Sequence, residues 1–223
     1  MSQLRTLVLT TVAMTAFAGN SLLCRAALRD TDIDAATFTS VRLISGALML
    51  WLLLAFRGNS ASMKQGSWGS ALALFVYAAA FSYAYGGLST AMGALLLFGA
   101  VQATMISIGI VRGDRPHPWQ WAGFVLAFAG LVGLLLPGLT APPLFSSLLM
   151  IGSGVAWGVY SLRAKGAGEP TAVSTGNFIR AVPMTVVLSL VMLTGASIDM
   201  AGMMYAIASG AVASGMGYAI WYM

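Results

Sequence analysis

The sequence predicts an all-α integral membrane protein with eight transmembrane helices, and three observations carry that prediction. Of its 223 residues, 59% are hydrophobic and 8% are charged, whereas soluble domains have about 25% charged residues. The mean hydropathy is +0.87. Charge-free stretches of about 20 residues or more, the length that crosses a bilayer, alternate with short charged segments. Helices are expected because they satisfy their own backbone hydrogen bonds in lipid.

Charged segments and helix breakers set the limits of each expected helix. The charge-free stretch 65–111 is too long for one span at about 1.5 Å per residue, and Gly86-Gly87 is its natural break. Prolines at 137–143 divide the next apolar stretch in the same way. The expected spans are 6–27, 36–56, 67–86, 90–111, 119–137, 145–165, 173–194 and 201–222.

The N-terminal 19 residues share features with a signal peptide. Arg5 precedes an apolar core, and the small-residue motif at 16–18 resembles a cleavage site. The charge-free run nevertheless continues to Cys24, which favours an uncleaved first span.

Basic residues are distributed unequally between the two sets of connecting segments. Seven lie at the N-terminus or in the expected loops 57–66, 112–118 and 163–172. Two, Arg25 and Arg29, lie on the opposite side. The positive-inside rule therefore predicts that the N-terminus and those three loops face the cytoplasm. The seven are Arg5, Arg57, Lys64, Arg112, Arg115, Arg163 and Lys165; the expected tryptophan belt at the same helix ends comprises Trp51, Trp68, Trp119, Trp121 and Trp221.

Two segments share one layout: an apolar helix, a polar turn, and a second apolar helix that contains one arginine. They are 17–54 and 156–193, and the enclosed arginines are Arg42 and Arg180. Five expected spans separate the copies, and because five is odd, the second copy starts from the opposite side of the membrane. Inverted repeats of this kind are typical of transporters whose two halves rock about a site near the bilayer midplane.

Five short motifs, spread over the whole chain, resemble those of one family. NSLLCRAALRD at 20–30 and TFTSVRLISGAL at 37–48 are similar to the first two helices of the drug/metabolite transporter superfamily, in its EamA-like branch. AYGGLSTAMGALL at 84–96 resembles the turn between the third and fourth helices. VAWGVYS at 155–161 and GYAIWY at 217–222 resemble the sixth and eighth. The resemblance implies a multi-pass carrier of the cell inner membrane, often an exporter of amino acids or other metabolites.

The chain departs from that family in its number of helices. The resemblance implies a 5+5 fold, two inverted repeats of five helices, whereas eight are expected here. Residues 1–140 would form the first repeat, and residues 141–223 a second repeat that lacks its last two helices. The last apolar run also reaches Met223 without a basic anchor. We therefore expect a fragment that does not transport alone, because one wall of a central cavity would be open.

Four polar residues inside the expected spans are candidates for solute binding, and each has a structural alternative. Arg42 and Arg180 are costly in lipid and are therefore functional candidates. Each also lies near enough to a helix end to reach the interface or to bond backbone carbonyls. Asn20 and Gln102 carry amides near mid-span, where an amide either binds solute or joins two helices.

Aromatic residues supply the remaining candidates. Trp157 is the tryptophan expected away from the interfacial belt, and Tyr160 follows it on the same helix. Both either line a solute cavity or pack in the core. Tyr77, Tyr83 and Tyr85 favour the core or the belt over a binding role.

Several functions fit a helical membrane protein of this composition. The favoured one is a secondary transporter that exports small metabolites such as amino acids by alternating access. Anionic or zwitterionic solutes are preferred, because the charges inside the spans, Arg42 and Arg180, are positive. A proton-coupled multidrug efflux pump is the alternative, but it needs a carboxylate in the membrane, and no acidic residue lies in an expected span. A non-transporting membrane fragment also remains open.

Other functions lack support in the sequence. An enzyme is not expected, since the chain has no HExxH motif and no paired aspartates across spans. No metal or cofactor is expected, and the single cysteine, Cys24, excludes an internal disulfide and a thiolate cluster. The net charge of +5 lies largely in loops and does not indicate nucleic acid as a partner. The expected partners are the bilayer and a small solute, and a homodimer stays open.

Overall fold

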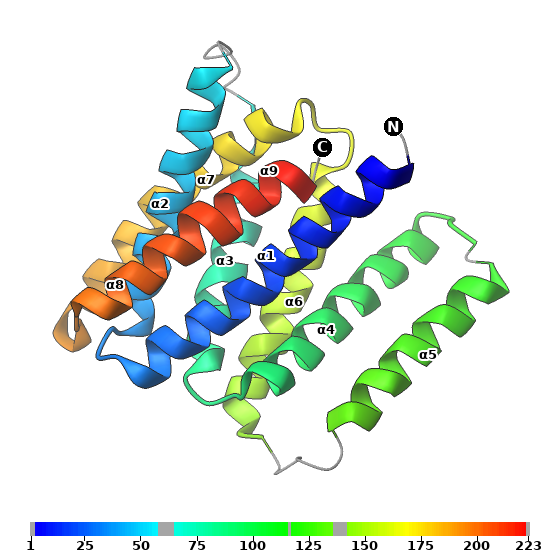
Figure 1. Ribbon diagram of the computed structural model, residues 1–223, viewed down its shortest axis with the longest axis horizontal. Coiled ribbons are helices and arrows are strands. Elements are labelled where there is room, and N and C mark those ends of the chain that lie inside the picture. The colour runs from blue at the N-terminus through cyan, green and yellow to red at the C-terminus, as the bar shows by residue number, and fades with distance from the viewer. Residues whose placement is uncertain (1–2, 58–64, 116, 136–141, 222–223) are drawn as a thin grey trace.

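The computed structural model describes residues 3–57, 65–115, 117–135 and 142–221. In this part of the chain, eight helical rods are joined by short connections (Figure 1). Seven of them are α1 (Gln3–Asp30), α2 (Ala35–Phe56), α3 (Trp68–Tyr85), α4 (Thr90–Val111), α5 (Pro118–Leu135), α6 (Leu144–Ala164) and α7 (Pro170–Val191), which the short η3 (Leu193–Gly195) follows. The C-terminal rod, Met200–Trp221, consists of α8 (Met200–Ile207), the π-helical η4 (Ala208–Met216) and α9 (Gly217–Trp221).

The prediction of an all-α membrane protein is confirmed. Six of the rods, all except α3 and α5, are long and apolar enough to cross a membrane. Each expected span corresponds to one rod, with ends that agree within a few residues. The expected end of the fifth span at 137 and most of the expected loop 57–66 lie outside the described residues. The 5+5 inverted arrangement stays a prediction.

Polar residues begin the helices at the positions where apolar segments leave the turns. Asp34, Ser67, Ser89 and Glu169 precede α2, α3, α4 and α7, and each side chain accepts a hydrogen bond from a backbone N–H in the first turn. These bonds satisfy donors that have no partner within the helix. Pro170 adds a preset backbone angle at the start of α7.

The rods pack as a bundle with α5 at its edge. The C-terminal rod runs along α1 and also contacts α2, while α2 packs on α7, and α6 packs on α3 and α4 (Figure 1). The close contact of α6 with α4 depends on Gly154 and Gly158. A Cβ atom at Gly154 would lie 2.6 Å from the carbonyl oxygen of Leu97, and one at Gly158 would lie 3.0 Å from Thr104. Close packing through small residues at a spacing of four is typical of helix contacts in membranes.

Candidate functional site

Arg42 lies in the centre of the bundle, where it is only 1% exposed. Its Nη2 donates a hydrogen bond of 2.8 Å to the hydroxyl of Tyr77 on α3. Its Nε donates a hydrogen bond of 3.3 Å to Oγ of Ser214 on η4. The burial excludes the alternative that Arg42 extends to the membrane interface.

One edge of the Arg42 guanidinium has no acceptor in the part of the chain that the structure describes. Nη1 is buried and has no hydrogen-bond partner among the described residues. The guanidinium carbon also lies 4.9 Å from the ring centroid of Phe81 and 5.1 Å from that of Tyr77, where aromatic faces attract a cation. Arg42 is thus a buried cation that is held in place and retains donor capacity.

The hydroxyl of Tyr77 joins Arg42 to a second polar residue, Asn20 of α1. Asn20 Nδ2 donates to this hydroxyl at 3.4 Å, and Asn20 Oδ1 accepts a bond of 2.6 Å from Oγ of Ser209 on η4. We call Asn20, Arg42, Tyr77, Ser209 and Ser214 the polar core. It connects four rods through side chains that are all buried.

Trp157 of α6 forms an aromatic wall beside the polar core. Its ring stacks with that of Tyr77 at a centroid distance of 5.9 Å and an interplanar angle of 26°. Phe17 and Phe98 make edge-type contacts with the Trp157 ring, with centroid distances of 5.2 Å and 6.0 Å. Trp157 Nε1 is buried and has no acceptor within the described residues. Two unused N–H donors, on Arg42 and Trp157, therefore flank the same tyrosine.

Ser209 and Ser214 reach the polar core because η4 is π-helical. In an α-helix, residues five apart point about 140° away from each other, whereas the i to i+5 bonds of a π-helix place them on nearly the same face. The segment SGAVASG at 209–215 repeats the pair Ser-Gly at a spacing of five. A regular helix is expected here from the sequence, and the π-helical form is a feature of the structure.

Two further predicted residues lie at other places. Tyr160 packs against Tyr218 of α9 at the border of the aromatic wall, with ring centroids 5.9 Å apart. Arg180 of α7 donates from Nη1 to the carbonyl oxygens of Gln65 at 2.7 Å and Gly176 at 2.9 Å. Arg180 thus fixes the segment that leads into α3, which matches the carbonyl-bonding alternative considered for it.

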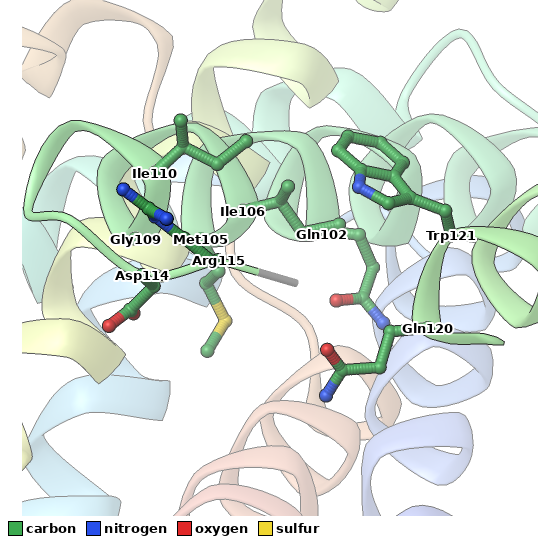
Figure 2. A pocket seen from close by; sticks show the side chains of 9 residues that line it. All are labelled: Gln102, Met105, Ile106, Gly109, Ile110, Asp114, Arg115, Gln120 and Trp121. Carbon is green, nitrogen blue, oxygen red and sulfur yellow. The ribbon is translucent and has the colours of Figure 1, made fainter. Parts of the chain in front are cut away.

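Gln102 of α4 is exposed, whereas Asn20 and Trp157 are buried. It lines a groove of about 530 Å³ between α4 and α5, to which Gln120 and Trp121 also contribute (Figure 2). Figure 2 shows Gln102 and Gln120 extending into the space between the two helices. The structure therefore brings together Asn20, Arg42 and Trp157, and it does not bring Gln102 to them.

Three members of the polar core were not among the candidates from the sequence: Tyr77, Ser209 and Ser214. Tyr77 is one of three tyrosines on the same helix, and the spacing of the three does not distinguish it. In the described part of the chain, no group of three or more His, Cys, Asp or Glu side chains is arranged to hold a metal ion. The polar core therefore offers hydrogen bonds and positive charge to a ligand, with stacking surface beside them.

Comparison with known proteins places the chain in a family. Residues 4–136 match the EamA-like transporter family. The uncharacterized protein PA1977 of Pseudomonas aeruginosa is 57% identical over 218 residues, which cover 98% of this chain and 76% of that protein. An uncharacterized transporter of Archaeoglobus fulgidus is 26% identical over 166 residues, or 71% of this chain and 56% of that protein.

A solved structure supports the fold. One crystal structure of a protein aligns with 96% of this chain and 78% of its own chain, with a TM-score of 0.73 and 18% sequence identity. This likeness concerns the fold alone. Together with the family match and the apolar helices, these similarities show that the chain belongs to the EamA-like transporter family and is a multi-pass membrane transporter.

Proposed function

We propose that this transporter exports small zwitterionic or anionic metabolites, with amino acids as the favoured class, by alternating access around the polar core. The observation that carries the proposal is Arg42, a buried guanidinium whose Nη1 has no acceptor among the described residues. We further propose that the protein lies in the cell inner membrane with its N-terminus in the cytoplasm, which the distribution of basic residues favours.

The charge of Arg42 supports a carboxylate in the solute. All six acidic residues of the chain lie in connections or at helix ends, so none of them is available to neutralise Arg42 in the core. A buried charge is expensive unless an opposite charge or several hydrogen bonds compensate it. A solute carboxylate at Nη1 would supply that compensation, and an arginine recognises carboxylates with favourable geometry.

The aromatic wall supports an apolar side chain on the same solute. Tyr77 and Phe81 present ring surface to the guanidinium, and Trp157 stacks on Tyr77. The Asn20 amide donates to the Tyr77 hydroxyl, and the buried Trp157 N–H is a second neutral polar group next to this tyrosine. Neutral amino acids with apolar side chains match this combination, because small-molecule sites are largely apolar with a few well-placed polar groups. Gln102 and Arg180 are assigned structural roles in this proposal.

The multidrug alternative is less well supported. A pump for cationic drugs needs a membrane carboxylate to bind the cation and exchange the proton, whereas the charge in this core is Arg42. A permanently positive core repels a cationic solute. The site therefore favours metabolites with a carboxylate over lipophilic cations.

Uptake into inside-out membrane vesicles tests the proposal, since uptake there corresponds to export. We expect uptake of neutral amino acids, its loss in Arg42→Gln and partial recovery in Arg42→Lys. Ser82→Ala is the matched control, because it removes a buried hydrogen bond of 2.8 Å between α3 and α2 at Thr39 and leaves the polar core intact. Uptake of lipophilic cations with no effect of Arg42→Gln would refute the proposal. Binding of the same amino acids to the purified chain, measured in parallel, separates a loss of recognition from a loss of transport.

A further inference from the structure

The repeated Ser-Gly pair in η4 has a geometry that an ordinary helix would not supply. Ser209 is fully buried against Asn20, and Ser214 is 4% exposed against Arg42. Between them, Val212 is 54% exposed on the outer face. Both serines therefore face the polar core, at a spacing of five residues.

The two glycines of the repeat allow the backbone of η4 to approach α2. A Cβ atom at Gly210 would overlap the carbonyl oxygen of Arg42 and the hydroxyl of Ser45. A Cβ atom at Gly215 would lie 3.1 Å from the Cβ of Met49. Only glycine fits the first of these positions without moving backbone, so the contact between η4 and the turn that carries Arg42 depends on it.

We propose that Ser209 and Ser214 are positioning residues that set the selectivity of the transporter for a carboxylate, and that the π-helical form of η4 is what allows both to act at once. Ser214 fixes the Nε edge of Arg42, so that Nη1 keeps one orientation toward the solute. Ser209 orients the Asn20 amide in the same way through Oδ1. This inference rests on the proposed function, because it assigns a role at the same site.

A helix with regular α geometry would lose this arrangement. π-helical segments are less regular than α-helices and frequently occur at functional sites. In an α-helical η4, Ser209 and Ser214 would diverge by about 140°, so one of them would leave the core. Deleting Val212 shortens the spacing of the serines from five to four, and in an α-helix they would then diverge by only about 40°. Both serines would therefore keep facing the core without a π-helix, and the deleted side chain points outward and is not part of the core.

Binding selectivity separates a positioning role from a merely structural one. The probes are L-leucine and L-leucinamide, which differ in whether a carboxylate is present. We expect the preference for L-leucine over its amide to fall about fivefold in Ser214→Ala and to stay near the wild-type value after deletion of Val212. A change that only loosens the fold would weaken both ligands equally and leave the ratio unchanged.

Matched controls accompany both variants. Ser40→Ala removes another serine of the interior, whose Oγ lies 2.8 Å from Ser189 Oγ and outside the polar core. Val212→Ala retains the chain length while trimming the same exposed side chain. Both controls should keep the wild-type preference for L-leucine. An unchanged preference in folded Ser214→Ala, or a lost preference in the folded deletion variant, would overturn the inference.

A second measurement does not depend on any solute. In thermal unfolding of the purified chain, Ser214→Ala should lower the midpoint in the wild-type background and have no further effect in Arg42→Gln. Equal effects in both backgrounds would mean that Ser214 does not act through Arg42, and would overturn the inference. A wild-type chain with no preference for L-leucine would instead contradict the proposed function. The thermal-unfolding comparison of Ser214→Ala in the two backgrounds would then still show whether Ser214 acts through Arg42.

Discussion

Removing the hydroxyl of Tyr77 tests whether the polar core is held as the structure indicates. Tyr77→Phe keeps the ring that stacks on Trp157 and deletes the acceptor of Arg42 Nη2 at 2.8 Å and of Asn20 Nδ2 at 3.4 Å. After the change, Nη1 and Nη2 of a buried cation would both lack a protein acceptor. The variant therefore isolates the hydrogen bonds from the packing.

The expected loss of stability follows from the two bonds. A hydrogen bond to a charged group contributes about 1.5–3 kcal/mol, and the longer neutral bond contributes about 0.5 kcal/mol. The total is about 2–3.5 kcal/mol. For a chain of this size, each kcal/mol shifts the unfolding midpoint by about 2–4 °C, so we expect a decrease of roughly 4–14 °C.

The single cysteine provides the assay. Cys24 is fully buried, so a thiol-reactive fluorophore in detergent reports when the bundle opens. Tyr83→Phe, on the same helix at a half-buried position, is the control and should match the wild type. If Tyr77→Phe unfolds within about one degree of Tyr83→Phe, Arg42 is not held by Tyr77 and the described site is wrong.

Three further predictions concern packing, pH and orientation. Gly210→Ala should destabilise the chain by about 1–3 kcal/mol in the same assay, because its Cβ overlaps backbone of α2, whereas Gly19→Ala, which meets open space, should not. Burial would raise the pKa of Asp34, but hydrogen bonds from Thr37, Ser197 and Ala36 outweigh burial and lower that pKa. The ionised Asp34 therefore contributes its full stabilisation above the unfolded-state pKa of about 3.9. That stabilisation is lost as the pH falls through the lower pKa of the folded state. The stability difference between wild type and Asp34→Asn should accordingly shrink when unfolding is measured from pH 6 down to pH 3, and a constant difference would contradict this. A cysteine at Ser60, introduced after replacing Cys24, should resist an impermeant thiol reagent added outside intact cells, and labelling there would reverse the proposed orientation.

Length, hydropathy and charge were enough to determine the helices from the sequence by itself. Each expected span became a rod because the bilayer imposes a nearly one-dimensional constraint: about 20 apolar residues, with charges and breakers at the ends. The Gly86-Gly87 break and the N-cap at Asp34 follow from local chemistry that acts within a few residues. Such signals depend little on the neighbours in space, which is why the sequence was sufficient.

The roles of the two intramembrane arginines were decided by the tertiary structure. Arg42 and Arg180 occupy similar positions in their helices and have the same chemistry, so the sequence alone did not distinguish them. Neighbouring rods make the difference: Tyr77 and Ser214 surround Arg42, whereas Arg180 meets the carbonyls of Gln65 and Gly176.

The rotation of each helix was also beyond the sequence. A soluble helix reveals its inward face by its apolar stripe, but in lipid the outside is as apolar as the core, and packing has no hydrophobic pattern to follow. From the sequence, Asn20 and Gln102 therefore had equal standing as mid-span amides, but Gln102 lies in the groove between α4 and α5, while Tyr77, one tyrosine among three, joins the polar core. The sequence determined which segments cross the membrane, and the packing of the rods determined which side chains meet inside it.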